Sequence, residues 1–135
     1  MKVRVLPWSK RIFMKIAIIG SRTFNDYDNL VRYIAENINV FRIELVVSGG
    51  AKGTDKLGEL FALHNNIPMK IYKPDWRKYG KIAGPIRNKQ IVKEVDIVFA
   101  FWDCKSKGTK NAIGLAKTMK KKVHIFRYFE KDIAG

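Results

Sequence analysis

The chain has 135 residues, of which 47% are hydrophobic and 29% are charged. This length and composition favour one globular domain with a sizeable core. The single cysteine, Cys104, excludes an intramolecular disulfide, and no apolar run reaches the length of a membrane span, so we expect a cytoplasmic protein that does not bind membranes. The 27 Lys and Arg residues outnumber the 12 Asp and Glu residues, and the resulting formal net charge of +15 favours anionic partners.

Three segments of different character divide the chain. Residues 1–13 are expected to form an N-terminal extension or an edge strand, because an alternating run from Lys2 to Leu6 is interrupted by Pro7. Residues 14–127 carry the regular pattern of a folded domain. Residues 128–135 are expected to form a C-terminal tail on the surface.

Apolar runs and helical stripes alternate through residues 14–127. The run Ile16–Ile19, ended by Gly20, is typical of a strand that is buried on both faces. A helix should follow, with Asn25 or Asp26 as its N-cap. Its expected apolar stripe consists of Leu30, Ile34, Ile38 and Phe41. The remaining expected elements are a strand over 43–47, a helix ended by Asn65 and Asn66, a strand over 69–72, a long loop over 73–84, a helix opened by Pro85, a strand over 96–101, a helix carrying Ala112 and Ala116, and a strand over 123–126.

This alternation predicts an α/β fold, a three-layer Rossmann-like domain with helices on both faces of a mainly parallel five-stranded sheet in the order 3-2-1-4-5. In this order the carboxyl ends of the first, second and fourth strands lie side by side, where such sheets bind ligands. Those ends carry Gly20-Ser21-Arg22, Ser48-Gly49-Gly50 and Trp102-Asp103. A ligand crevice is therefore expected there.

The stretch Ser48–Asp55 forms a glycine-rich turn between a predicted strand and a predicted helix. Glycines let the backbone approach a ligand closely, and the N–H groups at the start of a helix attract anions such as phosphate. The simpler alternative is that the glycines only turn the chain. Both interpretations are open from this stretch alone.

Several polar side chains in the predicted crevice suit a phosphorylated ligand. Arg22 and Arg87 could each bind a phosphate group through two hydrogen bonds. The hydroxyl groups of Ser21, Ser106 and Thr109 are suited to cap helices, to contact a phosphate oxygen, or to do both.

The aromatic and histidine side chains carry less specific information. Trp76, Tyr79 and Trp102 either pack against the protein or stack on a base. His64 lies on an apolar helical stripe and His124 lies within a predicted strand. Because neither has a second metal-binding side chain at a suitable spacing, no metal site is expected.

Five motifs follow one another along the chain. They are Gly20-Ser21-Arg22-Thr23-Phe24, Ser48-Gly49-Gly50-Ala51-Lys52-Gly53-Thr54-Asp55, Asp75-Trp76 with Tyr79-Gly80, Ala83-Gly84-Pro85-Ile86-Arg87-Asn88, and Phe101-Trp102-Asp103 with Ser106-Lys107-Gly108-Thr109. This series resembles that of the YspA-like group of the SLOG superfamily, a bacterial and phage group whose members mostly lack an assigned activity. The superfamily joins the Smf/DprA DNA-processing proteins to the LOG phosphoribohydrolases. The resemblance covers about Lys15 to Phe126.

The resemblance implies a Rossmann-like pocket for a nucleotide or a nucleotide-derived ligand, such as ADP-ribose or a dinucleotide, with no required cofactor. LOG enzymes combine an arginine before the fourth strand with a glutamate shortly after a Pro-Gly-Gly-x-Gly-Thr loop. Arg87 fits the arginine and Gly108-Thr109 fits the end of the loop, but residues 110–113 contain no acid. Catalysis is therefore left undecided, with Arg87, Asp55 and Asp103 as the candidate catalytic residues.

Binding or sensing of such a ligand is the favoured function. Two alternatives stay open: a nucleotide phosphoribohydrolase or N-glycosidase related to LOG enzymes, and a DprA-like nucleic-acid binder, for which the net charge predicts weak electrostatic binding. Assembly into a homo-oligomer is also left open. The phosphate is expected on Arg22 and on the N–H groups of residues 49–53, with the Trp76–Tyr79 segment above it. The residues expected to bind the ligand are Gly20, Ser21, Arg22, Ser48, Gly49, Gly50, Gly53, Thr54, Asp55, Arg87, Asn88, Trp102, Ser106, Gly108 and Thr109.

Overall fold

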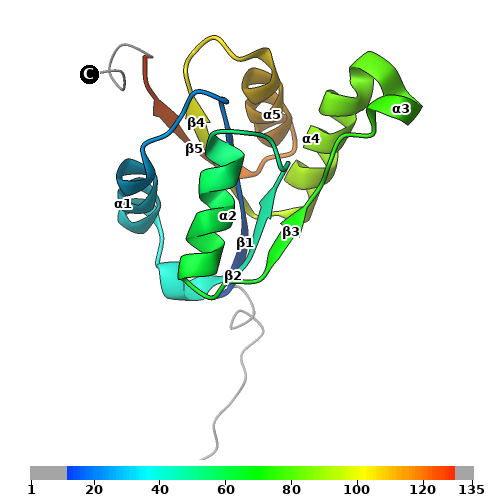
Figure 1. Ribbon diagram of the computed structural model, residues 1–135. Coiled ribbons are helices and arrows are strands. Elements are labelled where there is room, and N and C mark those ends of the chain that lie inside the picture. Colours follow the sequence, from blue (N-terminus) through cyan, green and yellow to red (C-terminus); the bar gives the residue numbers. More distant parts are fainter. Residues whose placement is uncertain (1–11, 130–135) are drawn as a thin grey trace, which may run out of the picture.

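A five-stranded sheet in the order β3-β2-β1-β4-β5 forms the centre of the protein (Figure 1). The computed structural model describes residues 12–129. The strands are β1 (Met14–Gly20), β2 (Ile43–Ser48), β3 (Met69–Ile71), β4 (Ile97–Trp102) and β5 (Lys122–Arg127). The helices are α1 (Tyr27–Asn37), α2 (Thr54–His64), α3 (Trp76–Tyr79), α4 (Ala83–Glu94) and α5 (Lys107–Thr118), with short 3-10 turns η2 (Val40–Arg42) and η3 (Gly80–Ile82). All neighbouring strands pair in parallel, which confirms the predicted α/β Rossmann-like fold and its strand order.

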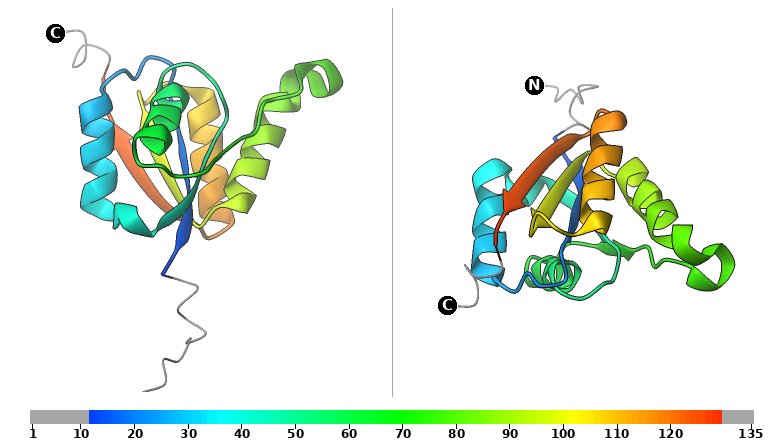
Figure 2. Two further views of the ribbon diagram at one scale, coloured as in Figure 1. Left: turned by 60° about the horizontal axis from the view of Figure 1, so that its bottom comes forward. Right: turned by 90° about the horizontal axis from the view of Figure 1, so that it is seen from above.

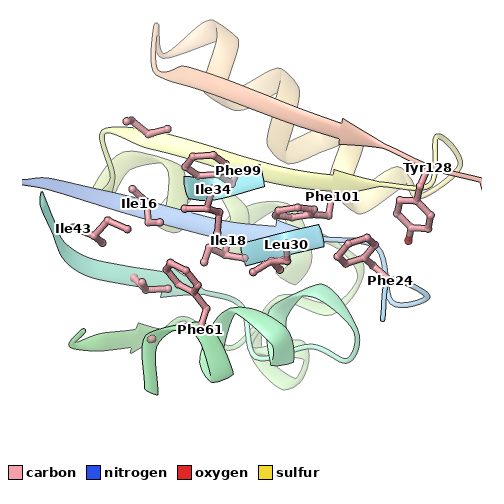
Figure 3. Close-up of a cluster of buried hydrophobic side chains, with 13 residues drawn as sticks. Ile16, Ile18, Phe24, Leu30, Ile34, Ile43, Phe61, Phe99, Phe101 and Tyr128 are labelled. Atoms are coloured by element: carbon pink, nitrogen blue, oxygen red, sulfur yellow. The ribbon is translucent and has the colours of Figure 1, made fainter. Parts of the chain in front are cut away.

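Helices cover both faces of the sheet (Figure 2). On one face, Leu30 of α1 and Phe61 of α2 pack with Ile18 of β1 (Figure 3). On the other face, Val92 of α4 packs in a second cluster that includes Ala17 of β1 and residues of α5. Successive residues of β1 thus enter different cores, because side chains alternate across a strand. Burial of both faces explains why the central strands are continuously apolar.

Two predicted helix caps are present. Asp26 precedes α1, and its side chain accepts a hydrogen bond from the N–H of Asn29 at 3.1 Å. Ser106 precedes α5, and its hydroxyl oxygen accepts a hydrogen bond from the N–H of Thr109 at 3.3 Å. Each contact satisfies an N–H group that has no acceptor within the helix.

The predicted apolar stripe of the first helix is wrong at its end. Leu30 and Ile34 are buried, as expected. The helix ends at Asn37 because Ile38 is extended, with a φ of −144°. The chain then makes the 3-10 turn η2, in which Phe41 is 92% exposed. Sequence spacing alone does not show where the backbone leaves the helical conformation, so the predicted stripe extended beyond the end of the helix.

Two further differences concern the loop before α4 and the C-terminal end. Residues 73–84, predicted as one long loop, contain α3 and η3. Tyr128, expected at the start of a surface tail, is buried, and its ring centroid lies 5.0 Å from that of Phe24. The Phe24 ring also lies edge-on to Phe126 of β5, with ring centroids 5.8 Å apart, so β5 and the residue after it help to close the first core. Residues 1–11 and 130–135, which include most of the predicted N-terminal extension and C-terminal tail, lie outside the described residues.

Candidate functional site

A cavity of about 470 Å³ lies at the carboxyl ends of the central strands. Its walls come from the exits of β1 and β2, the first turns of α4 and α5, and the ring of Trp76. Ligands of doubly wound sheets bind at this end, where the crossovers diverge to opposite faces. The volume is within the range of small-molecule sites.

Ser21, directly after β1, connects the end of β4 to the start of α2. Its hydroxyl oxygen accepts a hydrogen bond from the N–H of Asp103 at 3.1 Å. Its carbonyl oxygen accepts one from the hydroxyl of Thr54 at 3.0 Å, and its N–H donates to the carbonyl oxygen of Phe101 at 2.8 Å. Ser21 and Thr54 are almost completely buried. These two residues, expected to contact the ligand, therefore have structural partners within the protein.

Asp55 occupies the place that the sequence suggested for a phosphate. Its carboxylate accepts a hydrogen bond from the N–H of Ala51 at 3.0 Å, and the N–H of Gly49 also faces it. The N–H of Gly50 donates instead to the hydroxyl of Ser48, at 3.4 Å. The glycine-rich turn thus already binds the side chain of Asp55, and the N–H groups of Gly49, Gly50 and Ala51, which are part of the expected phosphate contacts, have partners in the protein.

Burial dominates the electrostatics of Asp55, which lines the cavity and is only 4% exposed. Burial raises the pKa of its carboxyl group, against the opposing effects of the Ala51 N–H and of the Arg87 charge. Asp55 is the only acidic side chain that lines the cavity within the described part of the chain.

Arg87 crosses from α4 to the end of β2. Its Nη1 donates a hydrogen bond to the carbonyl oxygen of Gly49 at 2.9 Å, and its Nε donates to Oδ1 of Asn88 at 3.0 Å. Burial lowers the pKa of the Arg87 guanidinium, Asp55 raises it, and Arg22 lowers it further by repulsion. Both arginines line the cavity. Two guanidinium groups therefore share one crevice, and one of them is partly desolvated.

Asn88 holds the α4 and α5 walls together. It is buried, and its side-chain amide donates to the carbonyl oxygen of Gly108 at 3.2 Å and to Oδ1 of Asn111 at 3.0 Å. Gly108 and Lys107 line the cavity in the first turn of α5. The N–H groups of such a turn lack acceptors within the helix and favour an anion nearby.

Asp103 organises the loop between β4 and α5. Burial opposes its charge, but hydrogen bonds from the N–H groups of Ser106 and Lys105 and from the Ser21 hydroxyl outweigh this effect and lower its pKa. The distances from the two N–H groups to Oδ1 are 2.8 and 2.9 Å. Asp103 does not line the cavity. An ionised carboxylate in this position shapes the loop, which leaves Asp55 as the candidate acid that faces the crevice.

The cavity brings together part of the set of residues expected to bind the ligand. Those that line it are Gly20, Arg22, Gly49, Asp55, Arg87, Asn88, Ser106, Gly108 and Thr109. Those that do not line it are Ser21, Ser48, Gly50, Gly53, Thr54 and Trp102. Trp102 is half-buried, and its Nε1 donates to the carbonyl oxygen of Ser106 at 3.1 Å.

Sequence reasoning missed several residues of the cavity wall. Trp76 was expected within a segment above the phosphate but was not named as a ligand contact, and neither were Lys107 and Asn111, although all three line the cavity. A signal for Lys107 and Asn111 was available, because both belong to the first two turns of a helix that starts at the crevice. The position of Trp76 depends on the unforeseen helix α3.

Other chemistry is sparse in the described region. No group of three or more His, Cys, Asp or Glu side chains among residues 12–129 is placed to hold a metal ion. His64 forms a hydrogen bond through Nδ1 with the hydroxyl of Tyr27 at 2.8 Å. Cys104 is exposed. Within the same residues, no helix has both the length and the apolar character that crossing a membrane requires.

The parallel sheet and the crevice at its carboxyl edge define a Rossmann-like α/β domain. A family model described as "YspA, cpYpsA-related SLOG family" matches residues 14–79, which supports the membership of the SLOG superfamily that the motifs predicted. The matched segment contains Arg22, Gly49 and Asp55 but ends before Arg87.

One curated protein and the solved structures complete these comparisons. The "Gene 61 protein" of Mycobacterium phage D29 is similar to this chain, with 29% identity over 106 residues that cover 73% of the chain and 85% of the phage protein. No solved structure gives a significant match.

Proposed function

We propose that the crevice binds a phosphorylated nucleotide-derived ligand, such as ADP-ribose or a dinucleotide. Membership of the SLOG superfamily suggests a nucleotide-related function for a Rossmann-like domain of this kind. A nucleoside with one or two phosphate groups is also of a size that suits the cavity of about 470 Å³.

The observation that carries the proposal is the pair of arginines, Arg22 and Arg87, in one cavity. The two guanidinium groups repel each other, and burial disfavours the charge of Arg87. Asp55 offsets part of this positive charge, but its carboxylate accepts the N–H of Ala51. Phosphate oxygens between the two guanidinium groups would relieve the repulsion through charge-assisted hydrogen bonds.

The expected position of the phosphate differs from the one that the sequence suggested. The N–H groups of Gly50 and Ala51 have partners in the protein. The first turn of α5, with Lys107 and Gly108 on the cavity wall, offers an alternative anion site opposite the glycine-rich turn. We therefore place the phosphate between the two arginines and this turn.

A hydrolytic function has less support. Cleavage of an N-glycosidic bond by water would use an acid and a base, and glycoside hydrolases usually supply two carboxyl groups for these roles. In the described residues Asp55 alone provides a carboxyl group in the cavity wall. Its raised pKa suits a proton donor, but its carboxylate is already engaged by the glycine-rich turn.

Isothermal titration calorimetry with ADP-ribose, NAD and nucleoside monophosphates tests the proposal. A charge-assisted contact is worth roughly 1.5–3 kcal/mol, so Arg22→Ala should weaken binding about tenfold or more. Lys117→Ala, which removes an exposed cation outside the cavity wall, is the matched control. Equal affinities of wild type and Arg22→Ala, with unchanged circular dichroism, would contradict the proposal.

A further inference from the structure

The segment Lys73–Ile82, which we call the arm, extends away from the sheet beyond the start of α4. Asp75 caps α3 by accepting the N–H of Lys78 at 3.1 Å, and Gly80, with a φ of +57°, ends the helix. In Figures 1 and 2 α3 lies at the outer end of this projection in every view. The arm therefore presents its side chains to solvent on a defined local backbone.

Large apolar side chains of the arm are exposed together. Trp76 is 56% exposed, Tyr79 38% and Ile82 60%. The Trp76 ring lies next to Gly84, and Trp76 also forms part of the cavity wall. A group of exposed apolar side chains within one short segment marks an interaction surface more strongly than isolated ones do.

The same segment is strongly basic. Lys73, Arg77, Lys78 and Lys81 are all exposed, and the one acid among them, Asp75, serves as the helix cap. The Lys78 ammonium lies 5.2 Å from the centroid of the Tyr79 ring. Cations and aromatic rings therefore alternate along the arm, and the charge favours an anionic partner.

We propose that the arm binds single-stranded nucleic acid, with bases stacked on Trp76 and Tyr79 and phosphates contacted by the neighbouring cations. Stacking accepts any unpaired base, and basic side chains follow the phosphate backbone. A paired duplex offers no base faces to the rings, and the four-residue helix α3 is too short to act as a recognition helix in a groove. This inference does not depend on the occupant of the cavity.

Fluorescence anisotropy with a labelled oligothymidine of about 16 nucleotides tests this proposal. Tyr79→Ala should weaken binding about tenfold, in line with the loss of one stacked base. Phe41→Ala, which removes a more exposed ring outside the arm, should bind like wild type. A duplex of the same length should compete poorly. Equal effects of the two substitutions, or equal competition by duplex, would overturn the proposal.

A charge variant provides a second test that does not alter the rings. Replacing both Arg77 and Lys78 by alanine should reduce the slope of log affinity against log salt by about 1.4, since each single-strand phosphate contact contributes about 0.7. Lys117→Ala with Lys120→Ala is the matched control, and its salt slope should equal that of wild type. The proposal fails if both pairs change the slope equally.

Two further measurements separate this surface from other roles. Tyr79 does not line the cavity, so Tyr79→Ala should bind mononucleotides like wild type whether or not they occupy the crevice. Sedimentation should show no change in oligomeric state on this substitution. The proposal would be overturned if wild type were a dimer that Tyr79→Ala dissociates while oligonucleotide affinity stays unchanged, because the arm would then be an interface between copies. It would also be overturned if the substitution selectively abolished binding of an acidic protein partner.

Discussion

The guanidinium of Arg87 donates a hydrogen bond to the carbonyl oxygen of Gly49 across 2.9 Å and thereby connects α4 to the exit of β2. This contact determines where the more buried arginine of the crevice lies. It also depends on the absence of a side chain at position 49, because a Cβ there would overlap Nη1 of Arg87 and lie 3.0 Å from a carboxylate oxygen of Asp55.

Gly49→Ala is therefore expected to weaken ligand binding without unfolding the protein. The added methyl group meets the end of a flexible side chain rather than backbone, so Arg87 should move and its ligand contact be lost. The expected loss is about tenfold in affinity, measured by calorimetry.

The control is Gly114→Ala on the exposed face of α5, where an added Cβ meets no atom within 4 Å. This control should raise the unfolding free energy by about 0.5–1 kcal/mol and leave affinity unchanged. Wild-type affinity in Gly49→Ala would contradict the assigned role of Arg87.

Affinity for an anionic ligand should depend on the ionisation of Asp55. Burial raises the pKa of this carboxyl group above its ordinary value of 3.8. As the pH falls through the raised pKa, the carboxylate becomes neutral and no longer offsets Arg22 and Arg87, so an anion should bind more tightly. ADP-ribose is the suitable probe, because the charge of its pyrophosphate stays constant near neutral pH.

Asp55→Asn should abolish this pH dependence and bind ADP-ribose at least as tightly as wild type. The amide oxygen can still accept the N–H of Ala51, so the turn should keep its conformation. Calorimetric titrations of both proteins over a pH series provide the measurement. A large loss of affinity in Asp55→Asn would instead show that the carboxylate itself contacts the ligand.

Hydrolysis of nucleoside monophosphates is expected to be negligible. Among the described residues, Asp55 alone contributes a carboxyl group to the cavity wall. The second carboxyl group that an acid–base pair would need is not found in that wall. Chromatographic detection of free base and ribose 5-phosphate is the assay. Turnover on the order of 1 per second, as in ordinary enzymes, would refute this expectation. Its loss in Asp55→Asn would then identify Asp55 as catalytic.

Acid should destabilise the protein partly through His124. Its Nε2 is buried without a hydrogen-bond partner among residues 12–129, and its ring stacks on Phe99 with centroids 4.9 Å apart. Burial, and next the charge of Lys122, lower its pKa below the ordinary 6.5. The unfolded chain therefore binds the proton first, and the unfolding free energy decreases as the pH falls from about 6.5 to the lower folded-state pKa.

His124→Phe should remove this contribution while keeping the ring on Phe99. Denaturant unfolding at several pH values measures the unfolding free energy of both proteins. In the difference between the two free energies, the titrations of other groups largely cancel. The unfolding free energy of wild type should fall more on acidification than that of His124→Phe. Parallel pH profiles would show that His124 is protonated equally in the folded and unfolded states.

The fold could be predicted because local patterns determine it. A run such as Ile16–Ile19 has to be buried on both faces, and strict alternation with helices then leaves few topologies. The caps Asp26 and Ser106 were recognisable because a cap acts on N–H groups a few residues away. Both features depend on short stretches of sequence.

The details of the site depend on contacts between distant segments, which the sequence does not display. Thr54 and Ser21 are 33 residues apart, and their hydrogen bond gives both of these expected ligand contacts a structural partner within the protein. Asp55 was proposed as a ligand contact or as a catalyst, whereas its nearest partners are N–H groups of its own turn. The arm was missed because a helix of one turn, α3, has no apolar periodicity to detect.

The hydrogen bonds of Ser21 to Thr54, Asp103 and Phe101 also have a kinetic consequence. They fix the base of the crevice through the protein's own groups, so an arriving ligand does not have to order these strand ends. Its association rate should then depend mainly on diffusion and on attraction by the +15 net charge. Higher salt should accordingly slow the capture of an anionic ligand and have a smaller effect on how long the ligand stays bound.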